Sequence, residues 1–147
     1  MVWKPHVTVA ALIERQGKFL LVEEETAQGR VLNQPAGHLE DGETLLAAVK
    51  RETLEESAWH FAPTHLVGIY HWKIPEKDLT YLRFAFTGQL QAHEAGRRLD
   101  DGIIAVHWLS LEQIHAARQR LRSPLVLRGI EDYAAGRRCP LDALVAL

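Results

Sequence analysis

Residues 37–59 read GHLEDGETLLAAVKRETLEESAW, and they fall on either side of a boundary between a loop and a helix. The stretch Pro35–Gly42, which includes the start of this segment, holds one proline and two glycines, and these residues favour turns. Thr44–Glu56 lacks glycine and proline and is rich in residues that favour helices, so it predicts a helix. Asp41 and Thr44 are both suited to cap the start of that helix.

Three glutamates lie on one face of this predicted helix. Glu52, Glu55 and Glu56 occupy positions i, i+3 and i+4, where side chains are neighbours. Three neighbouring carboxylates repel one another unless a cation lies among them, and such hard oxygen ligands favour Mg²⁺ or Mn²⁺. The alternative is an ordinary solvated helix face, on which Arg51 and Glu55 form an i, i+4 ion pair.

Apolar and alternating segments on both sides of the helix predict strands. The predicted strands are His6–Ile13, Lys18–Glu23, Val31–Gln34, His65–Trp72, Thr80–Leu90 and Ile103–Leu109. A capping box, Ser110 to Gln113, opens a second helix toward Arg120, and Ser123–Pro124 opens a third to about Ala135. The order of strands, helix, strands and helices predicts an α/β sandwich with a mixed sheet.

Length and composition exclude several classes of protein. The chain has 147 residues, 47% hydrophobic and 24% charged, which predicts one globular domain over residues 1–147. A formal net charge of -2 argues against a general binder of nucleic acid or of membrane surfaces. Cys139 is the single cysteine, so no disulfide forms within the chain. The chain starts without a signal-peptide pattern, and we expect a soluble cytoplasmic protein, either a monomer or a homodimer.

The spacing of residues in the quoted stretch matches a known motif. The matching residues are Gly37, Glu43, Arg51, Glu52, Glu55, Glu56 and Trp59. They fill seven of the nine constrained positions of Gly-x5-Glu-x7-Arg-Glu-U-x-Glu-Glu-x-Gly-U, where U is bulky and apolar, so the chain resembles the Nudix hydrolases. Thr53 stands where an apolar residue is usual, and Ala58 stands where glycine is usual. If the backbone at Ala58 is left-handed, alanine costs roughly 1 kcal/mol relative to glycine.

This resemblance implies an α/β/α sandwich that hydrolyses a diphosphate linked to another group. Four segments, 4–10, 33–40, 82–84 and 121–126, are more specifically similar to one branch of bacterial phosphatases within the family. That similarity implies nucleoside di- and triphosphates, and the thiamine-precursor pyrimidine diphosphate, as small-molecule substrates. The alternatives are a hydrolase of dinucleoside polyphosphates or nucleotide sugars, and a catalytically silent domain that senses a ligand.

The resemblance also implies roles for the motif residues. The implied Mg²⁺ ligands, with Mn²⁺ as a possible substitute, are the carbonyl of Gly37 and the carboxylates of Glu52, Glu55 and Glu56. Arg51 and Glu43 are expected to pair and to support the catalytic site by holding the loop against the helix. The general base is expected to be Glu55 or Glu56. The alternative base belongs to the pair Asp100-Asp101, whose other interpretation is turn chemistry before Gly102.

Four further residues are candidates for substrate binding. Arg83 lies on a predicted strand among aromatic residues, where a cation needs a partner, either a substrate phosphate or an internal carboxylate. Trp72 and Tyr81 are suited to stack on a base or pyrimidine ring, although packing against the core or its rim is the alternative. His38 lies in the loop, either within reach of phosphate or simply exposed.

Overall fold

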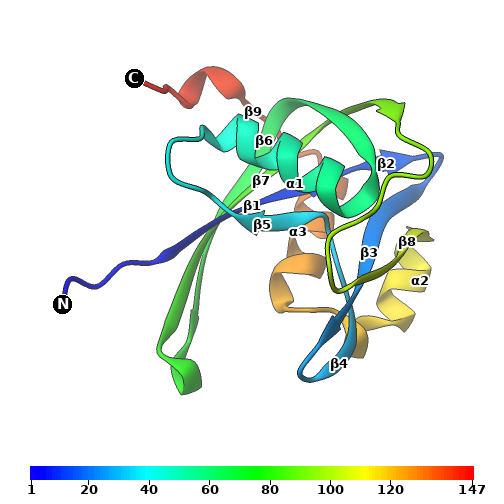
Figure 1. Cartoon of the computed structure of the whole chain (residues 1–147), viewed down its shortest axis with the longest axis horizontal. Helices are drawn as coiled ribbons and strands as arrows, with labels where there is room; N and C mark the ends of the chain where they lie inside the picture. Colours follow the sequence, from blue (N-terminus) through cyan, green and yellow to red (C-terminus); the bar gives the residue numbers. More distant parts are fainter.

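Two β-sheets form the frame of the computed structural model, which describes residues 1–147 (Figure 1). The larger sheet contains β5 (Ala36–His38), β1 (His6–Leu12), β7 (Leu79–His93), β6 (Trp59–Ile74) and β9 (Cys139–Pro140), in that order. The smaller sheet contains β2 (Glu14–Arg15), β3 (Lys18–Thr26) and β4 (Gly29–Asn33), with β8 (Ile103–Ser110) paired to β3. In the larger sheet β1 runs parallel to β7 and antiparallel to β5, so the predicted mixed sheet is confirmed.

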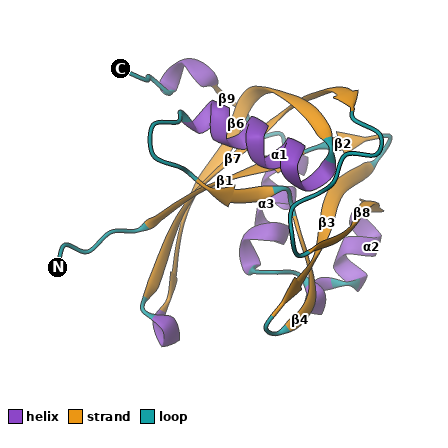
Figure 2. Cartoon of the chain, viewed as in Figure 1, coloured by secondary structure: helices purple, strands orange, loops and turns teal.

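Three α-helices and three short 3-10 turns complete the fold (Figure 2). The helices are α1 (Leu45–Ser57), α2 (Leu111–Ala116) and α3 (Pro124–Ala134). The turns are η1 (Pro75–Lys77), η2 (Arg118–Arg120) and η3 (Leu141–Ala143). None of the helices is both long enough and apolar enough to cross a lipid bilayer.

Helix α1 is capped at its start by the side chain of Thr44 and at its end by a left-handed residue, Ala58. The side chain of Thr44 accepts a hydrogen bond from the backbone N–H of Ala47 at 3.1 Å, so Thr44 rather than Asp41 is the cap. Ala58 ends the helix in the left-handed conformation, with φ 63° and ψ 14°, and its N–H donates to the carbonyl of Leu54. The left-handed turn that the motif places at this position is therefore present here with alanine.

The two faces of the larger sheet are covered by different helices, and successive strand residues alternate between them. Ala11 and Phe86 pack in one core cluster with Val49 of α1. Leu12 and Ala85, their neighbours in sequence, pack in a second cluster with Val126 and Ile130 of α3. The sheet therefore has a face toward α1 and a face toward α3, which is the layered arrangement expected of an α/β/α sandwich.

Several elements of the structure differ from the sequence prediction, and three of these differences lie in the loop before α1, in β6 and in α2. The expected loop Pro35–Gly42 contains the short strand β5, whose Gly37 pairs with Val9 of β1. Three residues around a glycine are too few to show a strand pattern. The strand expected at His65–Trp72 is longer, because its pairing with β7 continues at both ends. The helix expected to run to Arg120 stops before Ala117, whose φ of -96° and ψ of 13° leave the helical region.

Candidate active site

Arg51, on α1, is the centre of the hydrogen-bond network at the Nudix-like motif. Its guanidinium donates to both carboxylate oxygens of Glu43, at 2.7 and 3.0 Å, so the expected pair is present. The same group donates to Glu52 at 2.8 Å and to Glu55 at 3.2 Å. It also donates to the backbone carbonyl of His38 at 3.0 Å. One side chain therefore joins the loop before α1 to the acidic face of the helix.

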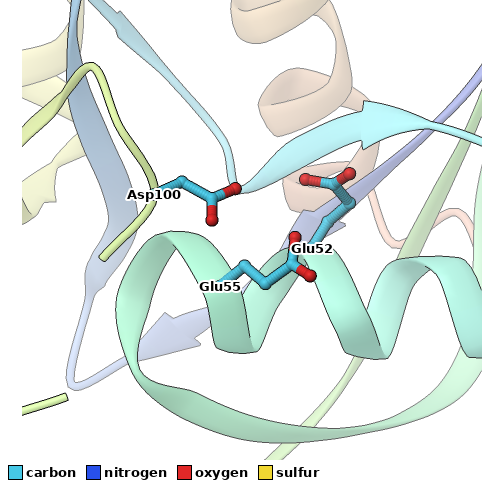
Figure 3. Close-up of side chains that lie close together, drawn as sticks. All are labelled: Glu52, Glu55 and Asp100. Atoms are coloured by element: carbon cyan, nitrogen blue, oxygen red, sulfur yellow. The ribbon is translucent and has the colours of Figure 1, made fainter. Parts of the chain in front are cut away.

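Three carboxylates gather beside this network. Oxygens of Glu52, Glu55 and Asp100 lie within 4.8 Å of one another. We call these three residues the carboxylate cluster. Figure 3 shows the carboxylates of the two glutamates, which come from α1, gathered near that of Asp100, which lies on the segment before β8. The backbone N–H of Asp100 donates to the carbonyl of Glu55 at 3.0 Å, which holds that segment against the end of α1. The neighbouring Asp101 is not in the cluster and instead pairs with Arg98 at 3.4 Å on the exposed surface.

The residues of the carboxylate cluster fit a hard divalent cation. Their side-chain donors are all oxygens, and carboxylates are the ligands with which proteins hold Mg²⁺. Gly37 on β5 leaves the space in which the carboxylate of Glu52 lies, because a Cβ at this position would overlap that carboxylate. Any larger residue at position 37 would therefore displace one of the candidate ligands. The carbonyl of Gly37 remains only a predicted ligand.

Glu56 lies deeper than the other two glutamates of the predicted metal site. Its side chain is buried, and Oε1 accepts a hydrogen bond from the backbone N–H of Ala36 at 2.9 Å. The gathering of three carboxylates is thus formed by Glu52 and Glu55 together with Asp100, while Glu56 contacts strand β5. A role for Glu56 as metal ligand or general base remains a prediction.

Burial changes the proton affinity of two of these acids. It raises the pKa of Glu56 to about 9, against the opposing effect of the hydrogen bond from Ala36. Burial also raises the pKa of Glu52 to about 7, although the hydrogen bond from Arg51 lowers it. Conversely, hydrogen bonds from Arg51 hold the pKa of Glu43 below its usual range. In the absence of a cation, Glu56 is therefore protonated at neutral pH and Glu52 is partly so.

Arg83, on β7, has partners that the sequence analysis did not include. The side chain is buried, and it donates to Oδ1 of Asn33 at 3.2 Å and to Oε1 of Gln34 at 3.5 Å. No carboxylate lies within ion-pair distance of it. Burial lowers its pKa to about 10, so it remains a cation at neutral pH. Two amide oxygens are therefore the partners of Arg83 within the protein, and its contact with a substrate phosphate stays a prediction.

The remaining candidates belong to a row of rings that starts at the motif loop. The ring of His38 lies 5.4 Å from that of His6, and His6 lies 5.3 Å from Tyr81. Tyr81 in turn stacks with Trp72, its partner across the β6–β7 pair, at 5.8 Å and an interplanar angle of 25°. We call these four residues the aromatic row. The sequence analysis missed His6, because its position beside Tyr81 depends on the parallel pairing of β1 with β7 and not on a local pattern.

An open pocket of about 430 Å³ lies at the loop end of the aromatic row. It is bounded by His6 and His38 on one side and by the loop residues 39–43 on the other. Glu43 is part of this wall and is also held by Arg51, so the pocket adjoins the network around the carboxylate cluster. The row and the pocket together offer a place for an organic group next to the acidic site.

Known proteins share both the sequence and the fold. A sequence profile of the NUDIX domain matches residues 3–128. The chain is 43% identical over 143 residues to the phosphatase NudJ of Escherichia coli strain K12, covering 97% of this chain and 92% of that protein. The solved structure of a NUDIX hydrolase from Nitrosomonas europaea is 50% identical, with a TM-score of 0.95 and coverage of 98% of both chains.

A more distant structure shares only the fold. The NUDIX domain of Shewanella oneidensis NrtR, solved in complex with ADP ribose, is 18% identical to this chain. Its TM-score is 0.74, over 92% of this chain and 90% of that one.

Proposed function

The chain belongs to the Nudix hydrolase family, and on that premise we propose that it is a Mg²⁺-dependent hydrolase of phosphoanhydride bonds in small nucleoside di- and triphosphates. We include the thiamine-precursor pyrimidine diphosphate among the proposed substrates, because the resemblance of the sequence to the phosphatase branch implies it. Mn²⁺ is a proposed substitute for Mg²⁺, since both prefer oxygen ligands.

One observation carries this proposal: the carboxylate cluster lies directly beside the guanidinium of Arg51. Glu52 and Glu55 come from the motif helix, and Asp100 comes from a segment about fifty residues later in the chain. Three carboxylates within 4.8 Å of one another repel, and Arg51 bonds only two of them, Glu52 and Glu55. A bound divalent cation turns this repulsion into binding, and the space left by Gly37 keeps Glu52 in place.

The residues then divide the chemistry among them. A bound Mg²⁺ neutralises the charge of the diphosphate and lowers the pKa of a coordinated water. Glu52, Glu55 and Asp100 would hold the cation, with the carboxylate of Glu56 and the carbonyl of Gly37 as further proposed ligands. Arg51 keeps Glu52 and Glu55 oriented through its hydrogen bonds. Glu55 is only half-buried and is the better proposed proton acceptor, because Glu56 is buried and already accepts the N–H of Ala36.

The organic part of the substrate is proposed to lie along the aromatic row. A planar base or pyrimidine ring would stack on Tyr81 and Trp72, whose rings stand at only 25° to one another. His38 is exposed at the loop end of the row, where it can donate to a phosphate oxygen. Arg83 remains a proposed partner for a substrate phosphate, and its bonds to Asn33 and Gln34 would hold its guanidinium in place.

A panel of substrates tests the proposal. The purified protein is offered nucleoside di- and triphosphates, the pyrimidine diphosphate, nucleotide sugars and dinucleoside polyphosphates, each with Mg²⁺, with Mn²⁺ and with EDTA. Orthophosphate and pyrophosphate release are measured separately. We expect metal-dependent release from the nucleoside phosphates and none with EDTA. Release confined to nucleotide sugars or dinucleoside polyphosphates would replace the proposed substrate class. No release from any compound would favour the ligand-sensing alternative.

A further inference from the structure

A second polar groove lies between strand β6 and helix α3. It has a volume of about 450 Å³, and its walls include Tyr70 and Trp72 of β6, Leu125 and Arg128 of α3, and Arg137 beyond the helix. We call these five residues the arginine groove. Helix α3 covers the opposite face of the larger sheet from α1 (Figure 1). The groove is lined by residues of β6 and α3 and therefore lies on the α3 side.

A buried carboxylate at the bottom of the groove holds both arginines. Asp132 accepts from Nε of Arg128 at 3.2 and 3.1 Å, one bond to each oxygen. Nε of Arg137 lies 3.5 Å from Oδ1 of the same carboxylate. The hydroxyl of Tyr70 donates to Oδ2 at 2.7 Å. Asp132 is thus shared by three donors, and its side chain is only 10% exposed.

The two arginines are anchored in a way that leaves their outer ends free. Arg128 and Arg137 both face Asp132 with Nε, and the terminal nitrogens of both have no partner in the protein. Their side chains are 59% and 63% exposed, so these nitrogens face solvent in the groove. Two guanidiniums against one carboxylate leave a net charge of about +1 at this place. Burial raises the pKa of the Tyr70 hydroxyl above its usual value, so this group stays protonated and adds no negative charge.

Two features of the β6 backbone, a register shift and Gly68, set the position of the Tyr70 ring. The pairing of β6 with β7 shifts register between Leu66 and Gly68, and such irregularities re-aim neighbouring side chains. A Cβ at Gly68 would lie 2.8 Å from the hydroxyl oxygen of Tyr70, so only glycine lets that ring lie over the strand. The ring position in turn directs the hydroxyl to Asp132. A bulge, a glycine and a buried acid thus combine to orient the two arginines.

We propose that the arginine groove binds the phosphate group of a small organic phosphate, with the organic part against Trp72 and Leu125. Guanidinium groups present paired N–H donors that match phosphate oxygens, and anchoring by Asp132 reduces the entropy lost on binding. Trp72 and Leu125 add an aromatic and an aliphatic surface for a ring or chain. The groove shares Trp72 with the aromatic row, but Arg128, Arg137 and Asp132 take no part in the hydrolysis proposed above, and binding to the arginines needs no metal.

Binding is tested without metal, so that the carboxylate cluster does not recruit the probe. Inorganic phosphate and thymidine monophosphate are titrated into the full chain in EDTA, and backbone amide signals are followed by NMR. We expect saturable shifts at Gly68, Arg128 and Arg137, at lower concentrations for the nucleotide, because it alone reaches Trp72. Inorganic phosphate reaching saturation as early as the nucleotide would contradict a role for Trp72 and Leu125. Saturable shifts confined to Gly37 and the motif helix, or no saturable shift, would overturn the proposal.

Two groove variants and a matched control give the decisive comparison. R128Q/R137Q removes both charges and is expected to weaken nucleotide binding at least tenfold. R128K/R137K keeps the charges beside Asp132 but removes the paired donors, and we expect at least a threefold loss. The control R30Q/R118Q removes two exposed arginine charges elsewhere and should stay within twofold of the native chain. Melting curves check that each variant folds. Unchanged affinity in a folded groove variant would show that its arginines bind no phosphate.

Discussion

Glu43 and Arg51 are eight residues apart in the chain and are joined by two hydrogen bonds, of 2.7 and 3.0 Å. The same guanidinium also holds Glu52 and Glu55, so the position of the loop and the position of the acidic side chains are coupled through one residue. This coupling explains why an arginine lies inside a site that is expected to bind a cation. It separates and orients the carboxylates that would otherwise repel one another.

Replacing Arg51 by lysine should preserve the charge and lose this coupling. The guanidinium makes five hydrogen bonds from three separate nitrogens, whereas an ammonium group has three donors on one nitrogen and cannot keep all five. We expect turnover to fall by at least about tenfold and Mg²⁺ affinity to fall with it, the usual scale for a residue that orients metal ligands. Steady-state kinetics and calorimetry measure the two effects. Arg30→Lys, at the exposed pair with Glu25, is the control and should leave both within twofold.

Asp100 and Asp101 provide a matched pair of substitutions. Asp100 belongs to the carboxylate cluster, whereas Asp101 is exposed and pairs with Arg98. Asp100→Asn replaces one charged oxygen ligand, so it should weaken Mg²⁺ binding and lower turnover, each by about ten- to a hundredfold. Asp101→Asn should change both by less than twofold. Equal effects of the two substitutions would indicate that this pair serves the turn before β8 and not the metal site.

Glu56→Gln should separate activity from stability. The amide oxygen of glutamine can still accept the N–H of Ala36, so we expect the fold to be kept. Loss of a carboxylate at the catalytic site should lower turnover by at least about a hundredfold. Near-native turnover in the folded variant would exclude Glu56 from the catalytic site.

The same variant should be more stable than the native chain when no metal is present. Glu56 has a usual pKa of 4.5 when unfolded and of about 9 when folded, so folding takes up a proton between these values. Native stability therefore falls as pH rises through this window, and glutamine removes that loss. At pH 8 in EDTA, we expect the melting temperature of the variant to be higher by at least about 2 °C. The difference should vanish near pH 4.

Metal binding should release protons. Burial gives Glu52 a pKa of about 7 and Glu56 one of about 9, and carboxylates must lose their protons before they bind a cation. Mg²⁺ affinity should therefore rise with pH between 6 and 9, with release of at least about half a proton per ion at pH 7. Calorimetry in buffers of different ionisation enthalpy measures the release. An affinity that is constant over this range would show that neither acid binds the ion.

The parts of the site that depend on neighbours in the chain were predictable from the sequence. Helical spacing places Glu52, Glu55 and Arg51 on one face, and the Arg51–Glu43 pair follows from the loop that leads into the helix. The caps of all three helices are also local, and Ser110 and Ser123 bond to the N–H groups expected of them. Such features need only the geometry of a few consecutive residues.

The features that differ depend on contacts between distant segments. Asp100 joins the cluster because its backbone is bonded to the end of α1, which no local pattern reveals. Glu56 turns toward Ala36 because β5 pairs with β1 and brings an unbonded N–H above the helix. Arg83 finds the amide oxygens of Asn33 and Gln34 across two sheets. The sequence predicted that Arg83 needed a partner, but the identity of that partner depends on tertiary packing.

Ala58→Gly tests the one position at which the motif is broken at the end of α1. Ala58 has φ 63°, a left-handed conformation in which a Cβ costs about 1–2 kcal/mol. Glycine removes that cost but gains about 0.5–1 kcal/mol of entropy in the unfolded chain and loses a buried methyl contact. These terms nearly cancel, so we expect a free energy of unfolding within about 1 kcal/mol of the native value, measured with denaturant. Ala135→Gly ends α3 in right-handed geometry and should be destabilised instead, because it gains no relief of strain. If both glycines destabilise equally, the left-handed backbone at Ala58 carries no strain.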